Sequence, residues 1–294
     1  MSLRNVLKGT GVALITPFKT NYEVDYDALE KVINFVINDG VEYLITLGTT
    51  GETPTLSKTE KIEIIDFTYE MVNNRVPVIV GIGGNNTKEL IDDLESYPLD
   101  EAIAVLSSSP AYNKPSQDGI YEHYKALAKA SPKPVILYNV PGRTSSNITA
   151  STTLRLADVK NIAGIKEASG NMTQCMHILR DRPENFLVVS GDDHLALPLI
   201  ACGMEGVISV AANCFPKDFS EMIRQALNNN FEKARCLHYK CLGGLDILFA
   251  ENNPAGVKAF LSELGIIQNV LRLPLVPLSK QLHQSVKDFL SKAS

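Results

Sequence analysis

Two apolar segments each end in a side chain that is suited to carbonyl chemistry. Lys166 ends the run Ile162-Ala-Gly-Ile-Lys166, and Tyr138 ends the run Val135-Ile-Leu-Tyr138. An amine that is walled by Ile and Ala loses solvation of its charged form, and such burial lowers the pKa of an amine by about 3 units or more. A neutral amine attacks carbonyl carbons, so the first hypothesis is a Schiff base on Lys166. The alternative is that Lys166 caps a strand and points into water.

The other polar residues give little support to metal or nucleotide chemistry. The five histidines are scattered, without an HxH or HxxxH pair. Asp192 and Asp193 are sequence neighbours that should point in different directions, which favours capping or structural roles over substrate contact. No GxGxxG motif follows the first apolar run, and the glycine-rich stretch at 81–84 lacks the lysine of a P-loop. We therefore expect neither a metal nor an organic cofactor.

Composition excludes several classes of function. The chain has 294 residues, of which 45% are apolar and 21% charged, enough for a large core. A net charge of -5 and the lack of any Lys/Arg-rich run argue against nucleic-acid binding. No apolar stretch approaches the roughly 18 residues of a membrane span, and the first eight residues lack the apolar core of a signal peptide. Five cysteines without a CxxC pair indicate reduced thiols, so we expect a cytoplasmic protein.

Eight short apolar runs, each followed by a helix-length amphipathic segment, predict alternating strands and helices. The runs cover residues 11–15, 43–47, 78–82, 102–106, 135–138, 162–166, 186–190 and 206–210. Asp25, Ser57 and Ser116 are expected N-caps of the helices that follow them. Eight strand–helix units within about 225 residues fit a TIM (βα)8 barrel better than an open doubly wound sheet.

The alternation ends near residue 224. Beyond it, helical patterns cover about 231–246, 254–264 and 279–292. Asn253 followed by Pro254 predicts a helix that has Asn253 as its cap and Pro254 in its first turn. We expect two domains, a barrel with the catalytic site at 1–224 and a helical domain at 225–294 that packs on the barrel or on a partner subunit.

Chemistry in a TIM barrel lies at the C-terminal ends of the strands, so the polar residues just past the expected strands are the candidate site. Gly48-Thr49-Thr50-Gly51 offers two hydroxyls and several backbone N–H groups, which suit a small carboxylate or phosphate; a tight turn is the equal alternative. Arg143 suits a substrate carboxylate, although a surface loop is the commoner place for arginine. Tyr138, taken alone, is a core or rim aromatic more readily than a proton relay.

Five ordered motifs resemble the dihydrodipicolinate synthase / N-acetylneuraminate lyase family. They are Gly48-Thr-Thr-Gly-Glu52, Tyr112-Asn-Lys-Pro-Ser116, Tyr138-Asn-Val-Pro-Gly-Arg143-Thr144, Gly164-Ile-Lys-Glu-Ala-Ser169 and Ser190-Gly-Asp-Asp193. The resemblance runs from Gly9 to the C-terminal helices. It implies a TIM barrel with a C-terminal helical extension, assembled as a homotetramer that is a dimer of dimers.

The resemblance implies a catalytic role for four residues. Lys166 would form the Schiff base with pyruvate, and Tyr138 would shuttle protons beside it. Thr49 would link Tyr138 to Tyr112, which would reach across from the neighbouring subunit. A phenol, a hydroxyl and a second phenol in a chain can pass protons while each stays neutral at rest.

Substrate binding is implied for four more residues. Thr50 would hold the pyruvate carboxylate, and Arg143 would bind the carboxylate of L-aspartate 4-semialdehyde. Gly191 and Ile208 are matched to backbone contacts in the pocket.

Within the family, Arg143 and the pair Thr49-Thr50 favour the synthase branch. Sugar-acid lyases generally lack that arginine, because polyol tails need hydroxyl partners. The implied reaction condenses pyruvate with L-aspartate 4-semialdehyde to 4-hydroxy-tetrahydrodipicolinate, a lyase-class step in lysine and diaminopimelate biosynthesis. The alternatives are a sister pyruvate-dependent 2-keto-acid aldolase, such as N-acetylneuraminate lyase, and a catalytically silent keto-acid sensor.

Lysine inhibition is expected to be weak or absent. Many bacterial members of the family bind lysine near the positions matched here by Thr53, Lys58, Lys61, Asn85, Glu89 and Ala111. Ala111 stands where sensitive members place an aromatic ring, and Lys61 stands where they commonly have His or Glu. The chain therefore lacks apolar cover for the lysine stem and adds a like charge near its ammonium.

Overall fold

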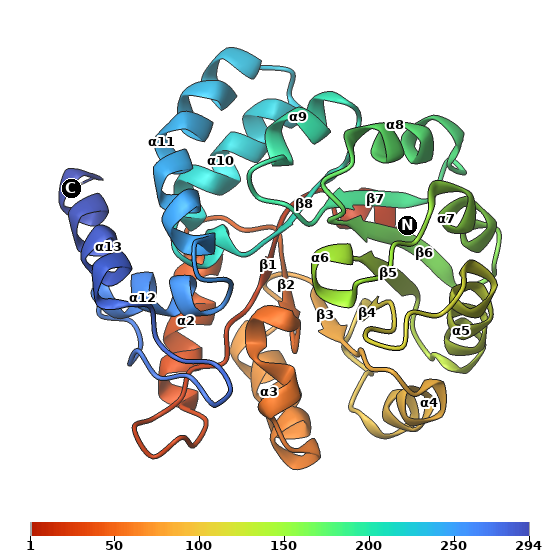
Figure 1. Cartoon of the computed structure of the whole chain (residues 1–294), viewed down its shortest axis with the longest axis horizontal. Helices are drawn as coiled ribbons and strands as arrows, with labels where there is room; N and C mark the ends of the chain where they lie inside the picture. Colours follow the sequence, from red (N-terminus) through yellow and green to blue (C-terminus); the bar gives the residue numbers. More distant parts are fainter. Residues whose placement is uncertain (1, 294) are drawn as a thin grey trace.

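A closed barrel of eight parallel strands forms the centre of the computed structural model, which describes residues 2–293 (Figure 1). The strands are β1 (Gly9–Ala13), β2 (Tyr43–Thr46), β3 (Val78–Gly81), β4 (Ala104–Ser108), β5 (Val135–Asn139), β6 (Ile162–Glu167), β7 (Leu187–Ser190) and β8 (Gly206–Ser209). Each strand pairs with the next one along the chain, and β8 pairs with β1 to close the barrel. All eight expected runs form strands, and the predicted fold class is confirmed.

Helices alternate with the strands, and most of them cover the outside of the barrel, whereas the short helix before β1 packs against the barrel interior and the short helix after β5 lies at the C-terminal strand ends. They are α1 (Leu3–Val6), α2 (Tyr26–Asn38), α3 (Lys58–Val72), α4 (Thr87–Ser96), α5 (Gln117–Ala130), α6 (Pro141–Thr144), α7 (Ala150–Ala157), α8 (Met172–Asp181), α9 (Ala196–Ala201) and α10 (Pro216–Leu227). The caps predicted at Asp25, Ser57 and Ser116 are confirmed, because each side chain accepts a backbone N–H from the first turn of its helix. No helix within residues 2–293 is long and apolar enough to cross a membrane.

The barrel interior is a packed core below the strand ends. Tyr43 on β2 is fully buried there, together with Ile79, Ile136 and Leu187 from other strands. A Cβ on Gly11 would lie 2.1 Å from the Tyr43 ring, so glycine is needed where the ring crosses β1. Because these side chains fill the barrel toward the N-terminal ends of the strands, an open site is confined to the C-terminal ends.

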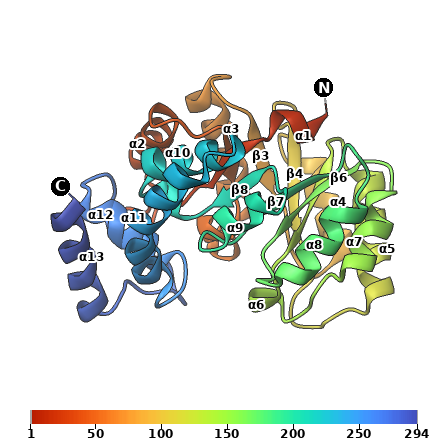
Figure 2. The ribbon, with the colours of Figure 1, turned by 90° about the horizontal axis from the view of Figure 1, so that it is seen from above.

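Three further helices form the C-terminal extension, which lies at one end of the molecule beside α2 and α10 (Figure 2). They are α11 (Phe231–Phe249), α12 (Ala255–Glu263) and α13 (Lys280–Ala293). The division expected at residue 224 falls inside α10, so we propose that the barrel domain extends to Leu227.

The start of α12 differs from the prediction. Its first residue is Ala255 and its N-cap is Pro254, so the prediction of Asn253 as the cap was wrong. The Asn253 side chain instead donates to the hydroxyl of Thr50, on the loop that follows β2. A contact between segments that are far apart in the chain has therefore replaced the local capping bond that the Asn-Pro pair suggested.

A buried charged pair ties the extension to the barrel. Lys258 on α12 contacts Glu52, which follows β2, and both side chains are fully buried. The Lys258 Nζ also donates to the Val270 carbonyl at 2.9 Å and lies 4.1 Å from the centre of the Phe18 ring. The backbone N–H of Arg272 donates to the second Glu52 oxygen at 3.0 Å. Burial lowers the pKa of Lys258 to about 8, although the Glu52 charge opposes this shift.

We expect Lys258→Met to lower the free energy of unfolding by about 3–5 kcal/mol, because it leaves the Glu52 carboxylate buried without its partner. The double variant Glu52→Gln/Lys258→Met removes both charges and should recover most of this loss. Urea unfolding followed by circular dichroism measures both variants. A single variant as stable as the parent protein would contradict the expectation.

Candidate active site

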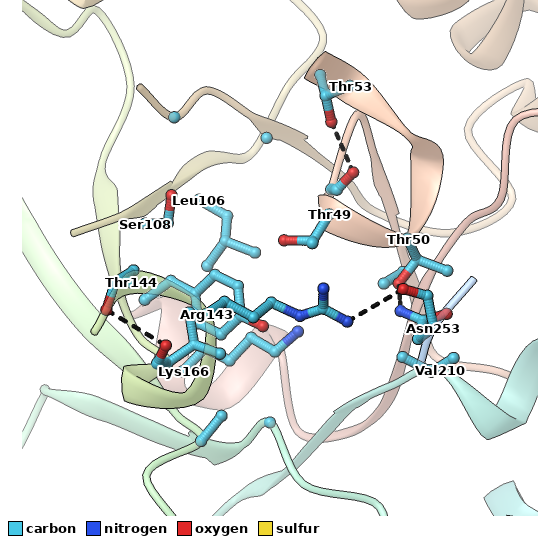
Figure 3. Close-up of a pocket in the computed structure, with 18 of the residues that line it drawn as sticks. Thr49, Thr50, Thr53, Leu106, Ser108, Arg143, Thr144, Lys166, Val210 and Asn253 are labelled. Carbon is cyan, nitrogen blue, oxygen red and sulfur yellow. Dashed lines mark hydrogen bonds between the residues drawn. The ribbon is translucent and has the colours of Figure 1, made fainter. Parts of the chain in front are cut away.

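A pocket of about 900 Å³ opens at the C-terminal ends of the strands (Figure 3). Residues that follow several strands line it, together with Asn252 and Asn253 of the extension. Six of the eight expected site residues are among them, namely Thr49, Thr50, Tyr138, Arg143, Lys166 and Gly191. No group of three His, Cys, Asp or Glu side chains arranged to hold a metal ion was found within residues 2–293. The polar groups that line the pocket include an amine, a phenol, hydroxyls and a guanidinium, together with the side chains of Asp192, Asp193 and His194.

The other two expected residues, Tyr112 and Ile208, do not line this pocket. Tyr112 lies on the loop after β4 with 91% of its surface exposed and a φ of 63°. Ile208 on β8 points its buried side chain into the apolar barrel interior, where its backbone pairs with Gly11. Val210, two residues further on, is the residue from this part of the chain that reaches the pocket.

Lys166 and Tyr138 lie side by side because β5 and β6 pair in a register that aligns them. The Lys166 Nζ lies 4.4 Å from the centre of the Tyr138 ring. Their exposed fractions are 4% and 8%, so the alternative that Lys166 points into bulk water is wrong. The amine is sheltered, faces an aromatic ring and remains open to a small molecule in the pocket.

A buried polar cluster on the outer side of the sheet secures this register. Asn139 and Glu167 are paired across β5 and β6, and the Asn139 Nδ2 donates to both Glu167 oxygens at 3.1 and 3.0 Å. Gln174 Nε2 and the backbone N–H of Ser169 donate to the same carboxylate at 3.2 and 2.7 Å. Neutral donors thus satisfy a buried anion directly behind the lysine–tyrosine pair. Sequence reasoning missed this cluster, although polar residues directly after Tyr138 and Lys166 were a signal for it.

Gly191, which follows β7, leaves room for the lysine. A Cβ at this position would lie 2.8 Å from the Lys166 Cε and 2.8 Å from the Ala168 Cβ. Both distances are shorter than the roughly 3.5–4.0 Å at which carbon atoms normally pack. Glycine is therefore required here by close approach and not by backbone conformation.

The two neighbouring aspartates have the structural roles expected of them. Asp193 Oδ2 accepts from the backbone N–H groups of Val210 and Ala211, each at 3.0 Å, and so holds the end of β8. Asp192 accepts from the backbone two residues further on. Burial raises the pKa of Asp193, while its hydrogen bonds and the charge of Lys166 oppose that shift.

The loop after β2 forms the tight turn that was one of the two roles expected for it, and its threonines also line the pocket. Thr49 and Thr50 begin a tight 3-10 turn (Thr49–Gly51), which the Thr53 hydroxyl stabilises by donating to the Gly48 carbonyl at 2.7 Å. The same turn presents both threonines to the pocket. Asn253 contacts Thr50 from the extension, a contact that no local pattern in the sequence could have indicated.

Comparison with known proteins agrees with this geometry. The family model described as "Dihydrodipicolinate synthetase family" matches residues 6–293. The chain belongs to the dihydrodipicolinate synthetase family. Membership confirms the resemblance that the five motifs indicated.

Relatives within the dihydrodipicolinate synthetase family are similar over almost the whole chain. The 4-hydroxy-tetrahydrodipicolinate synthase of Phocaeicola vulgatus is 53% identical over 92% of both chains. That of Flavobacterium psychrophilum is 49% identical over 97% of this chain and 98% of its own. The crystal structure of dihydrodipicolinate synthase from Thermotoga maritima has a TM-score of 0.95 at 38% identity, covering 98% of this chain and 99% of the other.

We expect Gly191→Ala to lower the free energy of unfolding by about 1–3 kcal/mol, because the added methyl must displace Lys166 or Ala168. Gly142→Ala, in the wall of the same pocket, is the matched control, since nothing lies within 4 Å of a Cβ there. Urea unfolding measures both variants. Equal losses of stability would show that Gly191 is not constrained by the lysine.

Proposed function

We propose that this protein condenses pyruvate with L-aspartate 4-semialdehyde to give 4-hydroxy-tetrahydrodipicolinate, a lyase-class step in lysine and diaminopimelate biosynthesis. The observation that carries this proposal is the sheltered Lys166 amine facing Tyr138, in a pocket that also contains Thr50 and Arg143. Relatives named 4-hydroxy-tetrahydrodipicolinate synthase, at 44% to 53% identity, support the synthase over the sugar-acid lyase and the silent sensor.

The first half of the reaction needs an amine and a proton carrier. The Lys166 amine attacks the keto carbon of pyruvate, and loss of water leaves a protonated imine. The imine withdraws electrons from the neighbouring methyl group, so a methyl proton leaves and an enamine forms. We assign the transfer of protons to and from these atoms to Tyr138, whose ring lies beside the amine.

The second half joins the substrates. The enamine carbon bonds to the aldehyde carbon, whose oxygen takes up a proton and becomes a hydroxyl. The amine of the semialdehyde then attacks the imine carbon, and this attack closes the ring. Lys166 leaves as the free amine. No redox partner is needed, because the changes in oxidation level of the two joined carbons cancel and the net reaction releases one water.

Two groups are suited to hold the two substrate carboxylates. Thr50 lies in the turn after β2, and we assign the pyruvate carboxylate to its hydroxyl and the neighbouring backbone N–H groups. Arg143 donates one N–H to the Asn253 carbonyl at 3.2 Å. A guanidinium has five such donors, so the remainder can bind the carboxylate of the semialdehyde. Gly191 and Ile208 stay proposed backbone contacts; the Ile208 side chain lies in the core and cannot contribute.

A homotetramer, as a dimer of dimers, is proposed for the assembled enzyme. Tyr112 has an aromatic ring that is 91% exposed and lies outside the pocket of its own chain. Thr49 lines the pocket, where the ring of a neighbouring subunit would complete the proton chain from Tyr138. A cytoplasmic location is proposed as well, and five unpaired cysteines suit a reducing compartment.

Weak or absent inhibition by lysine stays a prediction. The Ala111 backbone N–H donates to the Asn85 side-chain oxygen at 2.8 Å, so this oxygen is already engaged. Lys58 forms an ion pair with Asp93 at 3.2 Å. Both contacts compete with an effector at these positions.

Pyruvate plus borohydride should label the protein covalently at Lys166, because reduction converts the imine to a stable amine. Peptide mass spectrometry locates the label. Lys166→Ala should not be labelled. Labelling that persists in this variant, or a folded parent protein that is never labelled, would refute the proposal.

Arg143→Ala should raise the KM for the semialdehyde by on the order of 10²-fold, because it removes charge-assisted hydrogen bonds to a carboxylate. Labelling by pyruvate and borohydride should persist, since the guanidinium is assigned to the second substrate alone. Coupled turnover with varied semialdehyde measures the first effect. An unchanged KM would show that Arg143 is a structural loop residue.

A further inference from the structure

Asn253 in the C-terminal extension contacts two pocket residues at once. Its side-chain Nδ2 donates to the Thr50 hydroxyl oxygen at 2.8 Å, and its main-chain carbonyl accepts from the Arg143 Nη2 at 3.2 Å (Figure 3). Asn253 is 5% exposed and Thr50 is 2% exposed. Both side chains are therefore largely shielded from bulk water, and a hydrogen bond between them is stronger there than on the surface.

The bond from Asn253 determines the direction of the Thr50 proton. A threonine hydroxyl has one proton to donate and accepts through its lone pairs. Because the amide N–H of Asn253 donates, Thr50 accepts on that side and keeps its own proton for another partner. No hydrogen bond donated by the Thr50 hydroxyl is present within residues 2–293. A carboxylate in the pocket is an acceptor of the kind this proton needs.

The contact with Arg143 involves a different part of Asn253. The guanidinium binds the main-chain carbonyl, which every residue type provides. A substitution of the side chain therefore removes the bond to Thr50 and retains the acceptor for Arg143. The two contacts can be separated by experiment.

The segment around Asn253 is itself firmly held. Lys258, five residues further along the chain, forms the buried pair with Glu52, which lies two residues after Thr50. The extension and the loop after β2 are thus joined twice, once by the charged pair and once by the Asn253 side chain. This double connection limits movement of Asn253 relative to the pocket.

We propose that Asn253 is a positioning residue for the pyruvate half of the site. Its side chain keeps the Thr50 hydroxyl oriented as a donor toward the substrate carboxylate, and it acts only through Thr50. The extension is therefore part of the active site. This inference rests on the proposed function, because it takes pyruvate as the occupant beside Thr50.

A double-mutant cycle tests this coupling. The readout is the pyruvate concentration that gives half-maximal borohydride labelling of Lys166, which needs no second substrate. Asn253→Ala should raise this concentration by roughly 3- to 10-fold, and Thr50→Val by roughly 10-fold, from the usual size of a hydrogen bond to a charged group. Adding Asn253→Ala to Thr50→Val should cause no further change. The KM for the semialdehyde in Asn253→Ala should change by less than about 2-fold, because the carbonyl that holds Arg143 remains.

Two further variants control for folding and for local disturbance. Glu251→Gln changes an exposed side chain two residues before Asn253 that does not line the pocket, and its amide oxygen can still accept from the Ser279 N–H, so labelling should stay within about 2-fold of the parent. Asn253→Ser retains a polar group that is too short to reach Thr50. It should raise the half-maximal pyruvate concentration as Asn253→Ala does, and it replaces that variant if Asn253→Ala does not fold.

Three outcomes would overturn the inference. If the folded Asn253 variants reach half-maximal labelling at the same pyruvate concentration as the parent protein, the bond to Thr50 has no effect. Effects that multiply in the Thr50→Val background would show that Asn253 acts independently of Thr50. A parent protein that is never labelled would refute the proposed function, and it is distinguished from the other two outcomes because no variant is involved.

Discussion

The pairing of β5 with β6 is the constraint on which the rest of the site depends. This register places Tyr138 beside Lys166 inside the barrel and Asn139 beside Glu167 on its outer side. A slip by one residue would reverse the faces and bury the amine behind the sheet. Since the Glu167 carboxylate has bonds from Asn139 and two further donors, that slip would also leave a buried anion unsatisfied. The polar cluster therefore specifies the position of the reactive pair without touching the pocket.

The C-terminal extension holds the loop after β2 in place. The turn after β2 carries Thr49 and Thr50, and a short turn has little apolar surface with which to hold itself. The Glu52–Lys258 pair connects this turn to α12, and the bond from Asn253 connects it to the residues just before α12. A buried ion pair is a weak source of stability, because desolvation offsets most of the attraction. The Glu52–Lys258 pair can form only when the turn is in one position. This geometric selectivity is the property that the site requires.

Local signals explain what the sequence could predict. The eight strands and the caps at Asp25, Ser57 and Ser116 depend on residues close together in the chain, and they were predicted correctly. The barrel then brings strand ends together, which accounts for the six expected residues in the pocket. The bond between Asn253 and Thr50 joins residues 203 positions apart, so no local rule reveals it. The same bond explains why the capping prediction for Asn253 was wrong, because the partner of its side chain lies in the loop after β2.

Charge around Lys166 connects the fold with the chemistry. The imine that we propose is a cation in a sheltered pocket, and such a cation needs fixed negative groups or oriented dipoles near it. Asp193 lies in the pocket wall and interacts with the charge of Lys166, which lowers the pKa of this aspartate against the effect of burial. Asp193 is therefore an acidic group of the pocket wall whose charge can act on the proposed imine. Its two backbone hydrogen bonds at the end of β8 hold the carboxylate in place before any substrate arrives. An aspartate whose contacts are structural thus also prepares the pocket for a cation.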